Sequence, residues 1–168
     1  MNNQPPAPIL VLGLGNVLLG DDGLGPVLLR ELERTYASVS AVECIDGGTQ
    51  GLALLGCLAG RKTVIILDAF ANGKTSGEVS VLERPELLGA RSPRSTTAHE
   101  GNAGELLAAA QLLGELPERI FLVGIEPDRM QTELALSPSV TNALPIAFTR
   151  ACEIVEREMT LVARPAVA

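Results

Sequence analysis

Short apolar runs, separated by segments with helical spacing, dominate this chain. The runs over residues 9–14, 39–45, 63–68 and 120–124 are rich in Val, Ile and Leu, and each meets a Gly or an Asp at its end. Such runs are typical of strands that are buried on both faces of a sheet. Residues 78–82 instead alternate between polar and apolar side chains, which predicts an antiparallel strand at the edge of the sheet.

Between these runs, apolar residues recur at the spacing of helices that pack on a sheet. Pro26 falls in a first helical turn, where proline is tolerated, and the apolar spacing then continues to Tyr36. Further helices are predicted over residues 51–59 and 103–113. We expect these helices to cover the faces of the sheet.

Prolines and polar residues mark the remaining segments. The last helix is predicted to open at Ser137 and Pro138, which form a cap and first-turn pair, and Pro145 would kink or restart it. Residues 84–98 combine prolines with a Ser/Thr cluster and predict a long irregular segment, of a kind that is often functional. Residues 126–136 predict a loop.

Strands that alternate with helices predict an α/β fold. We expect a three-layer α/β/α sandwich around a mainly parallel, twisted sheet of about five strands, joined by right-handed crossover connections. At 168 residues the chain is long enough for one domain with a proper core. We assign that domain to residues 9–160, between a flexible arm at residues 1–8 and a disordered tail at residues 161–168.

The composition excludes several classes of protein. Hydrophobic residues make up 46% of the chain and aromatic residues only 2%, so the core must consist of aliphatic side chains. The formal net charge of −7 argues against nucleic acid as a partner, because phosphate binding relies on Lys and Arg. The first apolar run is interrupted by Gly13 and Gly15, and no basic segment precedes it. We therefore expect neither a signal peptide nor a membrane span.

The cysteines indicate a reducing compartment. Cys44, Cys57 and Cys152 have no CxxC spacing, and their number is odd. A disulfide scaffold would show an even and denser set. We therefore expect a cytoplasmic protein in which these side chains are small buried hydrophobic groups.

One glycine-rich stretch carries the first candidate chemistry. After the run at residues 9–14, the chain passes through Gly15 and Asn16 and reaches two adjacent carboxylates, Asp21 and Asp22, just before a helix. Ligands in open α/β sheets bind at the carboxyl ends of strands, so chemistry is expected at this loop. A phosphate loop would offer backbone N–H groups and a lysine there, whereas carboxylates repel phosphate and attract cations.

Three side chains stand out as a candidate metal site. Asp22 ends the first loop, Asp68 ends the third predicted strand, and His99, the only histidine, follows the irregular segment. The ends of neighbouring parallel strands meet at one edge of a sheet, so these groups can converge there. Two carboxylates and an imidazole suit a borderline divalent cation such as nickel or zinc.

Structural roles offer another explanation of the same residues. Asp21 and Asp22 can cap a helix or stabilise its dipole, and Asp68 can bind the amides of a loop. A single histidine such as His99 is often a surface residue. Asp46 precedes Gly-Gly and can stabilise a turn through its own backbone bonds.

Other chemistries fit the sequence less well. Gly13 and Gly15 begin like a dinucleotide-binding fingerprint, but the third glycine should fall at Leu18, and Gly20 is out of register. A dinucleotide-binding module, with an acid near the end of the second strand as the ribose-binding group, is therefore the second interpretation. Neither a P-loop motif nor the GxSxG motif of serine hydrolases is present.

Three motifs together indicate a family. They are Gly13-Leu-Gly-Asn-Val-Leu-Leu-Gly-Asp-Asp-Gly-Leu-Gly25, Asp46-Gly-Gly-Thr-Gln-Gly51 and Val64-Ile-Ile-Leu-Asp-Ala69. In this order and spacing, the chain resembles the hydrogenase maturation endopeptidases, which remove the C-terminal extension from the large-subunit precursor of nickel–iron hydrogenases. The resemblance extends from Ile9 to Met159 and implies a peptidase that acts on one protein partner.

The resemblance also implies roles for single residues. A triad that contacts metal in that family corresponds to Asp22, Asp68 and His99 here, and the first of these places holds Glu or Asp. The implied metal is nickel that the substrate's own cysteines already hold, so no permanent organic cofactor is expected. The triad would recognise this nickel and position the scissile bond for cleavage.

A second group of residues is expected to receive the tail of the precursor. This predicted substrate loop borders the same edge of the sheet, and Asp46 would orient the tail. A non-catalytic, nickel-dependent hydrogenase chaperone that uses the triad only for docking is the third interpretation. The substrate-loop residues are Asn16, Asp46, Gly47, Gly48 and Thr49.

Overall fold

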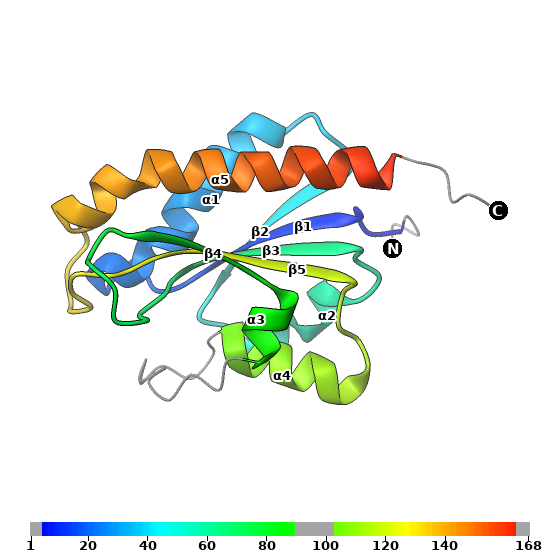
Figure 1. Cartoon of the computed structure of the whole chain (residues 1–168), viewed down its shortest axis with the longest axis horizontal. Helices are drawn as coiled ribbons and strands as arrows, with labels where there is room; N and C mark the ends of the chain where they lie inside the picture. Colours follow the sequence, from blue (N-terminus) through cyan, green and yellow to red (C-terminus); the bar gives the residue numbers. More distant parts are fainter. Residues whose placement is uncertain (1–4, 90–102, 164–168) are drawn as a thin grey trace.

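The computed structural model describes residues 5–89 and 103–163, which form three layers (Figure 1). A five-stranded sheet lies in the middle of this part of the chain, with helices on both faces, so the predicted α/β/α sandwich is confirmed. The strands are β1 (Ile9–Leu14), β2 (Val42–Gly48), β3 (Thr63–Ala69), β4 (Val79–Glu83) and β5 (Arg119–Ile125). The helices are α1 (Leu24–Tyr36), α2 (Leu55–Leu58), α3 (Arg84–Gly89), α4 (Ala103–Leu113) and α5 (Pro138–Val162), with 3₁₀ turns η1 (Gly20–Gly23) and η2 (Gly51–Leu54).

The strand order places the ends of β1 and β3 side by side. The order is β2-β1-β3-β5-β4, and all neighbours are parallel except β4, which runs antiparallel to β5 at the edge, as predicted. From β1 the chain goes to β2 on one side and then crosses to β3 on the other side. This reversal makes the carboxyl ends of β1 and β3 a topological switch point, the place where ligands bind in open α/β sheets.

Aliphatic side chains fill the space between the layers. All six residues of β1 are buried, as expected for a central parallel strand. Helices α1 and α5 cover one face of the sheet (Figure 1), where Leu28, Leu32 and Ala147 belong to the same core cluster as Ile65. Helices α2, α3 and α4 lie on the opposite face, which includes Leu12. Aliphatic side chains therefore form most of this core, as the sequence predicted.

Strand β2 lies further along the chain than its pattern predicts. The sequence predicts a strand at residues 39–45, whereas β2 begins at Val42 and ends at Gly48. Pairing with β1 sets this register, because Ile9 lies opposite Val42. The preceding residues form a turn instead, in which the Val42 N–H donates to the Val39 carbonyl at 3.0 Å.

The predicted irregular segment begins with a helix. Helix α3 occupies the first part of residues 84–98, so the prediction is wrong there. The Glu86 carboxylate accepts the backbone N–H of Glu83 at 2.9 Å, which satisfies one of the free donors at the start of a helix. The rest of this segment lies outside the described residues.

Helix α5 does not restart at Pro145. It runs without a break from Pro138 to Val162, and its cap is the predicted one, because the Ser137 hydroxyl accepts the Val140 N–H at 3.4 Å. Pro145 is exposed, so water can satisfy the carbonyl that loses its partner there. Neither α5 nor any other helix in the described part of the chain is both long and apolar enough to cross a lipid bilayer.

A buried carboxylate fastens α5 to the amino end of the sheet. Glu158 is 1% exposed and accepts the Thr63 hydroxyl at 2.8 Å. Its second partner is the guanidinium of Arg119, at the start of β5. Because β3 and β5 both begin here, Glu158 stabilises the end of the sheet that lies opposite the switch point.

Candidate functional site

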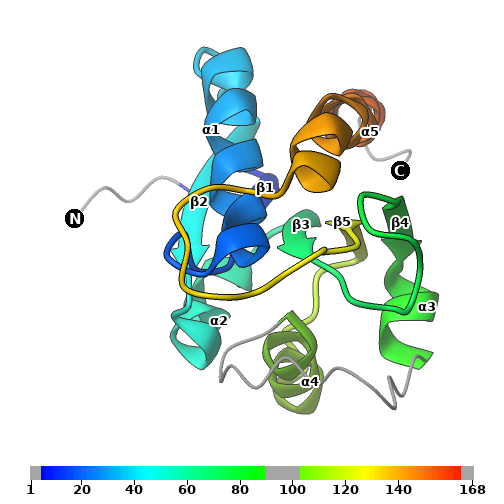
Figure 2. The ribbon, with the colours of Figure 1, turned by 90° about the vertical axis from the view of Figure 1, so that its left-hand side faces the viewer.

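Three loops meet at the carboxyl edge of the sheet, which faces the viewer in Figure 2. We call them the β1 loop (residues 15–23), the β3 loop (residues 70–78) and the β5 loop (residues 126–137). The β5 loop crosses the edge from β5 to the β1 loop and then returns to the start of α5 (Figure 2). The predicted site residues Asp22 and Asp68 lie in this region, in the β1 loop and at the end of β3.

Two glycines allow the β1 loop to fold tightly over the switch point. Gly15 has a φ of +120°, and a Cβ there would lie 1.8 Å from the carbonyl oxygen of Asp22. A Cβ at Gly25 would lie 2.1 Å from the Leu14 carbonyl oxygen and 2.5 Å from that of Leu67. Without side chains at these positions, the loop can turn back on itself and α1 can begin directly against β1 and β3.

Asp22 is held inside the β1 loop. It lies in η1, is 8% exposed, and its Oδ2 accepts the backbone N–H of Asn16 at 2.8 Å. The Asn16 side chain turns back onto the same loop, where its Oδ1 accepts the Leu18 N–H at 3.0 Å. These bonds fix the Asp22 carboxylate at the switch point.

Asp68, at the end of β3, interacts with Asp22. Burial raises the pKa of the half-buried Asp68 to about 7, the negative charge of Asp22 adds to this rise, and the N–H of Ala69 acts in the opposite direction. The two carboxylates are therefore close enough to repel each other. A proton or a cation would relieve this repulsion. The structure thus brings together the first two residues of the predicted site.

Asp21, the neighbour of Asp22, is directed toward the β5 loop. It is fully buried, and its carboxylate accepts the backbone N–H groups of Asp128 at 2.8 Å, Arg129 at 3.0 Å and Ser137 at 2.6 Å. Burial acts to raise the pKa of Asp21, but the three hydrogen bonds together hold it below its usual value. The suggested helix-capping role is not seen, because the N-cap of α1 has no side-chain hydrogen bond.

His99, the third predicted ligand, lies outside the described residues. Within residues 5–89 and 103–163, no group of three or more His, Cys, Asp or Glu side chains is arranged to hold a metal ion. The complete triad therefore stays a prediction, two members of which the structure describes.

The predicted substrate loop borders the β1 loop. The Gly15 N–H donates to the Gly48 carbonyl at 3.0 Å, which joins the two segments. Asp46 stabilises its own turn, because its Oδ1 accepts the Gly48 N–H at 3.1 Å, so its structural role is observed. Gly47 is buried, and Thr49 is exposed beside it. The loop thus offers an accessible surface next to the switch point.

Exposed apolar side chains lie on the β1 and β5 loops. Val17, Leu18 and Leu134 are 40%, 55% and 80% exposed, and we call them the apolar rim. The Leu18 carbonyl accepts the N–H of Glu133 at 3.0 Å, which places the backbone of Leu134 beside the β1 loop. An apolar group that is exposed beside a polar site is typical of a surface that contacts another molecule.

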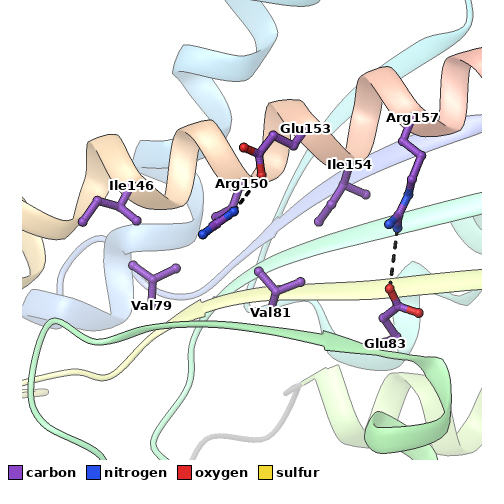
Figure 3. Close-up of a pocket in the computed structure, with 8 residues that line it drawn as sticks. All are labelled: Val79, Val81, Glu83, Ile146, Arg150, Glu153, Ile154 and Arg157. Carbon is purple, nitrogen blue, oxygen red and sulfur yellow. Dashed lines mark hydrogen bonds and ion pairs between the residues drawn. The ribbon is translucent and has the colours of Figure 1, made fainter.

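A groove of about 580 Å³ lies elsewhere, between β4 and α5 (Figure 3). Its charged side chains pair with one another, Arg150 with Glu153 at 3.0 Å and Arg157 with Glu83 at 3.6 Å. It contains none of the predicted site residues, so we do not assign the site to it. The groove is lined by Val79, Val81, Glu83, Ile146, Arg150, Glu153, Ile154 and Arg157.

Two of the three cysteines, Cys44 and Cys152, are not suited to nucleophilic chemistry. Cys44, Cys57 and Cys152 are free thiols, and all three are half-buried, whereas the sequence predicted buried side chains. Burial raises the pKa of Cys44 to about 11, and the charges of Glu33 and Glu43 contribute. Burial also raises the pKa of Cys152. A thiol with a raised pKa carries little thiolate at neutral pH, and the thiolate is the nucleophile.

The sequence of this chain is similar to those of known hydrogenase maturation proteases. The model of the HycI hydrogenase maturation protease family matches residues 26–154. The chain is 36% identical to the hydrogenase 2 maturation protease of Escherichia coli over 132 residues, which are 79% of this chain and 80% of that protein. It is 33% identical to HupD, a hydrogenase expression/formation protein of Rhizobium leguminosarum bv. viciae, over 164 residues, which are 96% of this chain and 81% of that protein.

Solved structures show the same architecture. The hydrogenase maturating endopeptidase HybD from Escherichia coli superposes with a TM-score of 0.80 at 31% identity, over 89% of this chain and 93% of that chain. The hydrogenase maturation protease HybD from Thermococcus kodakarensis shares the fold, with a TM-score of 0.67 at 24% identity, over 87% of this chain and 97% of that chain. The sheet and the helices that carry the β1, β3 and β5 loops are therefore a recurrent framework.

Proposed function

Since the chain belongs to the hydrogenase maturation protease family and is a peptidase, we propose that it removes the C-terminal extension of the large-subunit precursor of a nickel–iron hydrogenase. The family match, which runs from α1 into α5, carries this proposal. The dinucleotide-binding interpretation of the sequence has no support from these relatives, which are named as proteases and hydrogenase formation proteins.

We propose further that Asp22, Asp68 and His99 contact nickel that the precursor already holds, and that they position the scissile bond. The pair of carboxylates at the switch point supports this proposal, because they repel each other in the free protein. A divalent cation brought by the substrate would be attracted to both, and it accepts carboxylate and imidazole as ligands. Cleavage would then depend on nickel loading, and the protein would need no permanent organic cofactor.

Two neighbouring surfaces would receive the precursor. The predicted substrate loop is bonded to the β1 loop through Gly15 and Gly48, so a tail that lies along it would reach Asp22. The apolar rim lies along the β1 and β5 loops, where it would contact apolar side chains of the folded precursor. The substrate would thus bind through surfaces on both sides of the carboxylates.

The first test compares two forms of the host's large-subunit precursor, nickel-loaded and nickel-free. We expect mass spectrometry to show the loss of a C-terminal peptide from the loaded form alone. Loss from both forms would contradict nickel recognition. Stable binding without any loss of mass would instead favour the non-catalytic chaperone.

Substitution of the triad tests the site itself. Asp22→Ala, Asp68→Ala and His99→Ala should each slow cleavage of the loaded precursor by about 10²-fold or more, as expected for groups that contact the reacting atoms. Glu31→Ala, an exposed acid on α1, is the control and should leave the rate unchanged. Normal rates in all three site variants would show that the assignment is wrong.

A further inference from the structure

We propose that Asp21 is a positioning residue that holds Asp22 and Asp68 in their working arrangement. The inference rests on the proposed function of those two carboxylates. Asp21 is fully buried and precedes Asp22 in η1, yet the three backbone N–H groups that it accepts belong to residues at the two ends of the β5 loop. Of these two adjacent carboxylates, Asp21 therefore bonds to the β5 loop, whereas Asp22 bonds within the β1 loop.

Asp21 joins both ends of the β5 loop to the β1 loop. Its Oδ2 accepts from Asp128 and Arg129 near the start of the β5 loop, and its Oδ1 accepts from Ser137 at the end. Between these ends, the Gly20 N–H donates to the Glu133 carbonyl at 2.7 Å. The backbone that carries Asp22 is thus fixed along the whole side that faces the β5 loop.

The same bonds continue to the segment that follows Asp68. The Ser137 hydroxyl lies 3.0 Å from that of Ser139, which lies 2.7 Å from the hydroxyl of Ser76 in the β3 loop. At the other end of the β5 loop, the Glu126 carboxylate accepts two backbone N–H groups of the β3 loop, at 2.8 and 3.2 Å. A continuous set of hydrogen bonds therefore links the β1 loop, through Asp21 and the β5 loop, to the β3 loop.

Loss of the Asp21 carboxylate would change the position of the β1 loop, which carries Asp22, relative to the β3 loop, which follows Asp68. The buried N–H of Ser137 and the part-buried N–H groups of Asp128 and Arg129 would lose a charged acceptor, which costs free energy unless the loops shift to find other partners. A displacement of about 1 Å at a catalytic group can lower the rate about 10²-fold. The expected effect is therefore on the chemical step, whereas contacts with the precursor through the apolar rim should persist.

The test compares Asp21→Asn with Glu158→Gln. Each change keeps the size of a buried side chain and replaces one carboxylate oxygen by an NH2 group, which donates and cannot accept an N–H. Glu158 lies at the opposite end of the sheet, so its variant controls for lost stability alone. At a temperature where circular dichroism shows both variants folded, we expect a kcat about 10- to 100-fold lower for Asp21→Asn with little change in KM, and near-normal kinetics for Glu158→Gln.

Hydrogen exchange gives a readout that needs no substrate. The amides of Asp128, Arg129 and Ser137 should exchange faster in Asp21→Asn and remain protected in Glu158→Gln. If Asp21→Asn does not fold, Ser139→Ala is the second variant, because it removes one hydroxyl of the half-buried serine chain. It should lower kcat a few-fold, and an unchanged kcat in that variant would overturn the proposal.

The outcomes separate the positioning role from the proposed function. Equal kcat values for Asp21→Asn and Glu158→Gln, or unchanged exchange in the β5 loop, would overturn the positioning role. Asp22→Ala is measured in the same assay. If Asp22→Ala is inactive while Asp21→Asn behaves like Glu158→Gln, only the positioning role is wrong. If Asp22→Ala cleaves normally, the proposed site is wrong and the positioning role with it.

Discussion

At the residue scale, Asp21 and Asp22 show that two carboxylates adjacent in the sequence can have different roles. Asp21 is surrounded by backbone N–H groups, which hold its pKa low, and it connects two loops. Asp22 accepts one N–H from Asn16 and faces the like charge of Asp68. The motif made both residues candidates, but only their surroundings distinguish the structural carboxylate, Asp21, from Asp22, the carboxylate of the proposed site.

Asp68→Asn should stabilise the protein at pH 8 and much less at pH 4. An unfolded Asp loses its proton near 3.8, whereas folded Asp68 keeps it up to about pH 7. The folded state binds this proton more strongly than the unfolded state. The resulting contribution of Asp68 to the free energy of unfolding is fully present below pH 3.8 and is lost as the pH rises through 7. The amide removes the charge that burial and Asp22 disfavour.

Melting temperatures by calorimetry at both pH values would check this prediction. The variant should melt higher than the natural protein at pH 8, while it loses cleavage of the precursor. A gain of the same size at pH 4 would mean that the charge of the half-buried Asp68 is not the cause. Such a trade between stability and activity is common where acids are held close together in a site.

At the element scale, the close approach of α1 to the sheet makes the β1 loop short. The carbonyl oxygens of Leu14 and Leu67 occupy the space that a side chain at Gly25 would need. Gly13 contributes from the strand side, because a Cβ there would lie 2.9 Å from the Gly25 carbonyl oxygen. The glycines of the motif therefore serve packing, which explains why they do not follow the register of a dinucleotide fingerprint.

Gly25→Ala should destabilise the fold by at least about 2 kcal/mol, because the added methyl group meets backbone atoms that cannot move aside. Gly56→Ala is the matched control, since a Cβ at that position in α2 has nothing within 4 Å. The control should change stability by less than about 1 kcal/mol. Urea denaturation measures both changes, and equal effects would contradict the packing role of Gly25.

At the scale of the whole molecule, the proposed site depends on the strand order, because the chain adds β2 on one side of β1 and then β3 on the other side. Asp22 comes from the β1 loop and Asp68 from the end of β3, and the strand order makes these two segments neighbours. The β5 loop then crosses the same edge and brings Leu134 beside the β1 loop (Figure 2). A polar centre and an apolar rim therefore share one face, which fits the proposed action on a protein precursor.

Leu134→Glu should raise the KM for the precursor about five- to tenfold and leave kcat near its normal value. The side chain is 80% exposed, so the charge should not disturb the fold, but it would enter an apolar contact with the substrate. Leu112→Glu, at an 88% exposed position on α4, is the matched control. The same KM in the two variants would exclude Leu134 from the docking surface.

The sequence by itself determined the features that depend on local patterns. The apolar runs predicted β1, β3 and β5, and the alternation of polar and apolar residues predicted the antiparallel edge strand β4, because burial on both faces or one face sets the composition of a strand. Three motifs were sufficient to indicate the family. The start of β2 and the presence of α3 were missed, since the first depends on pairing with β1 and the second on one capping bond.

Only the tertiary structure decided what each acid does. The N–H partners of Asp21 lie 107 to 116 residues further along the chain, a separation that no local pattern encodes. The repulsion between Asp22 and Asp68 likewise follows from the strand order and from burial. A pattern of residues reports which groups are available, whereas their charge, exposure and hydrogen bonds depend on neighbours that distant segments supply.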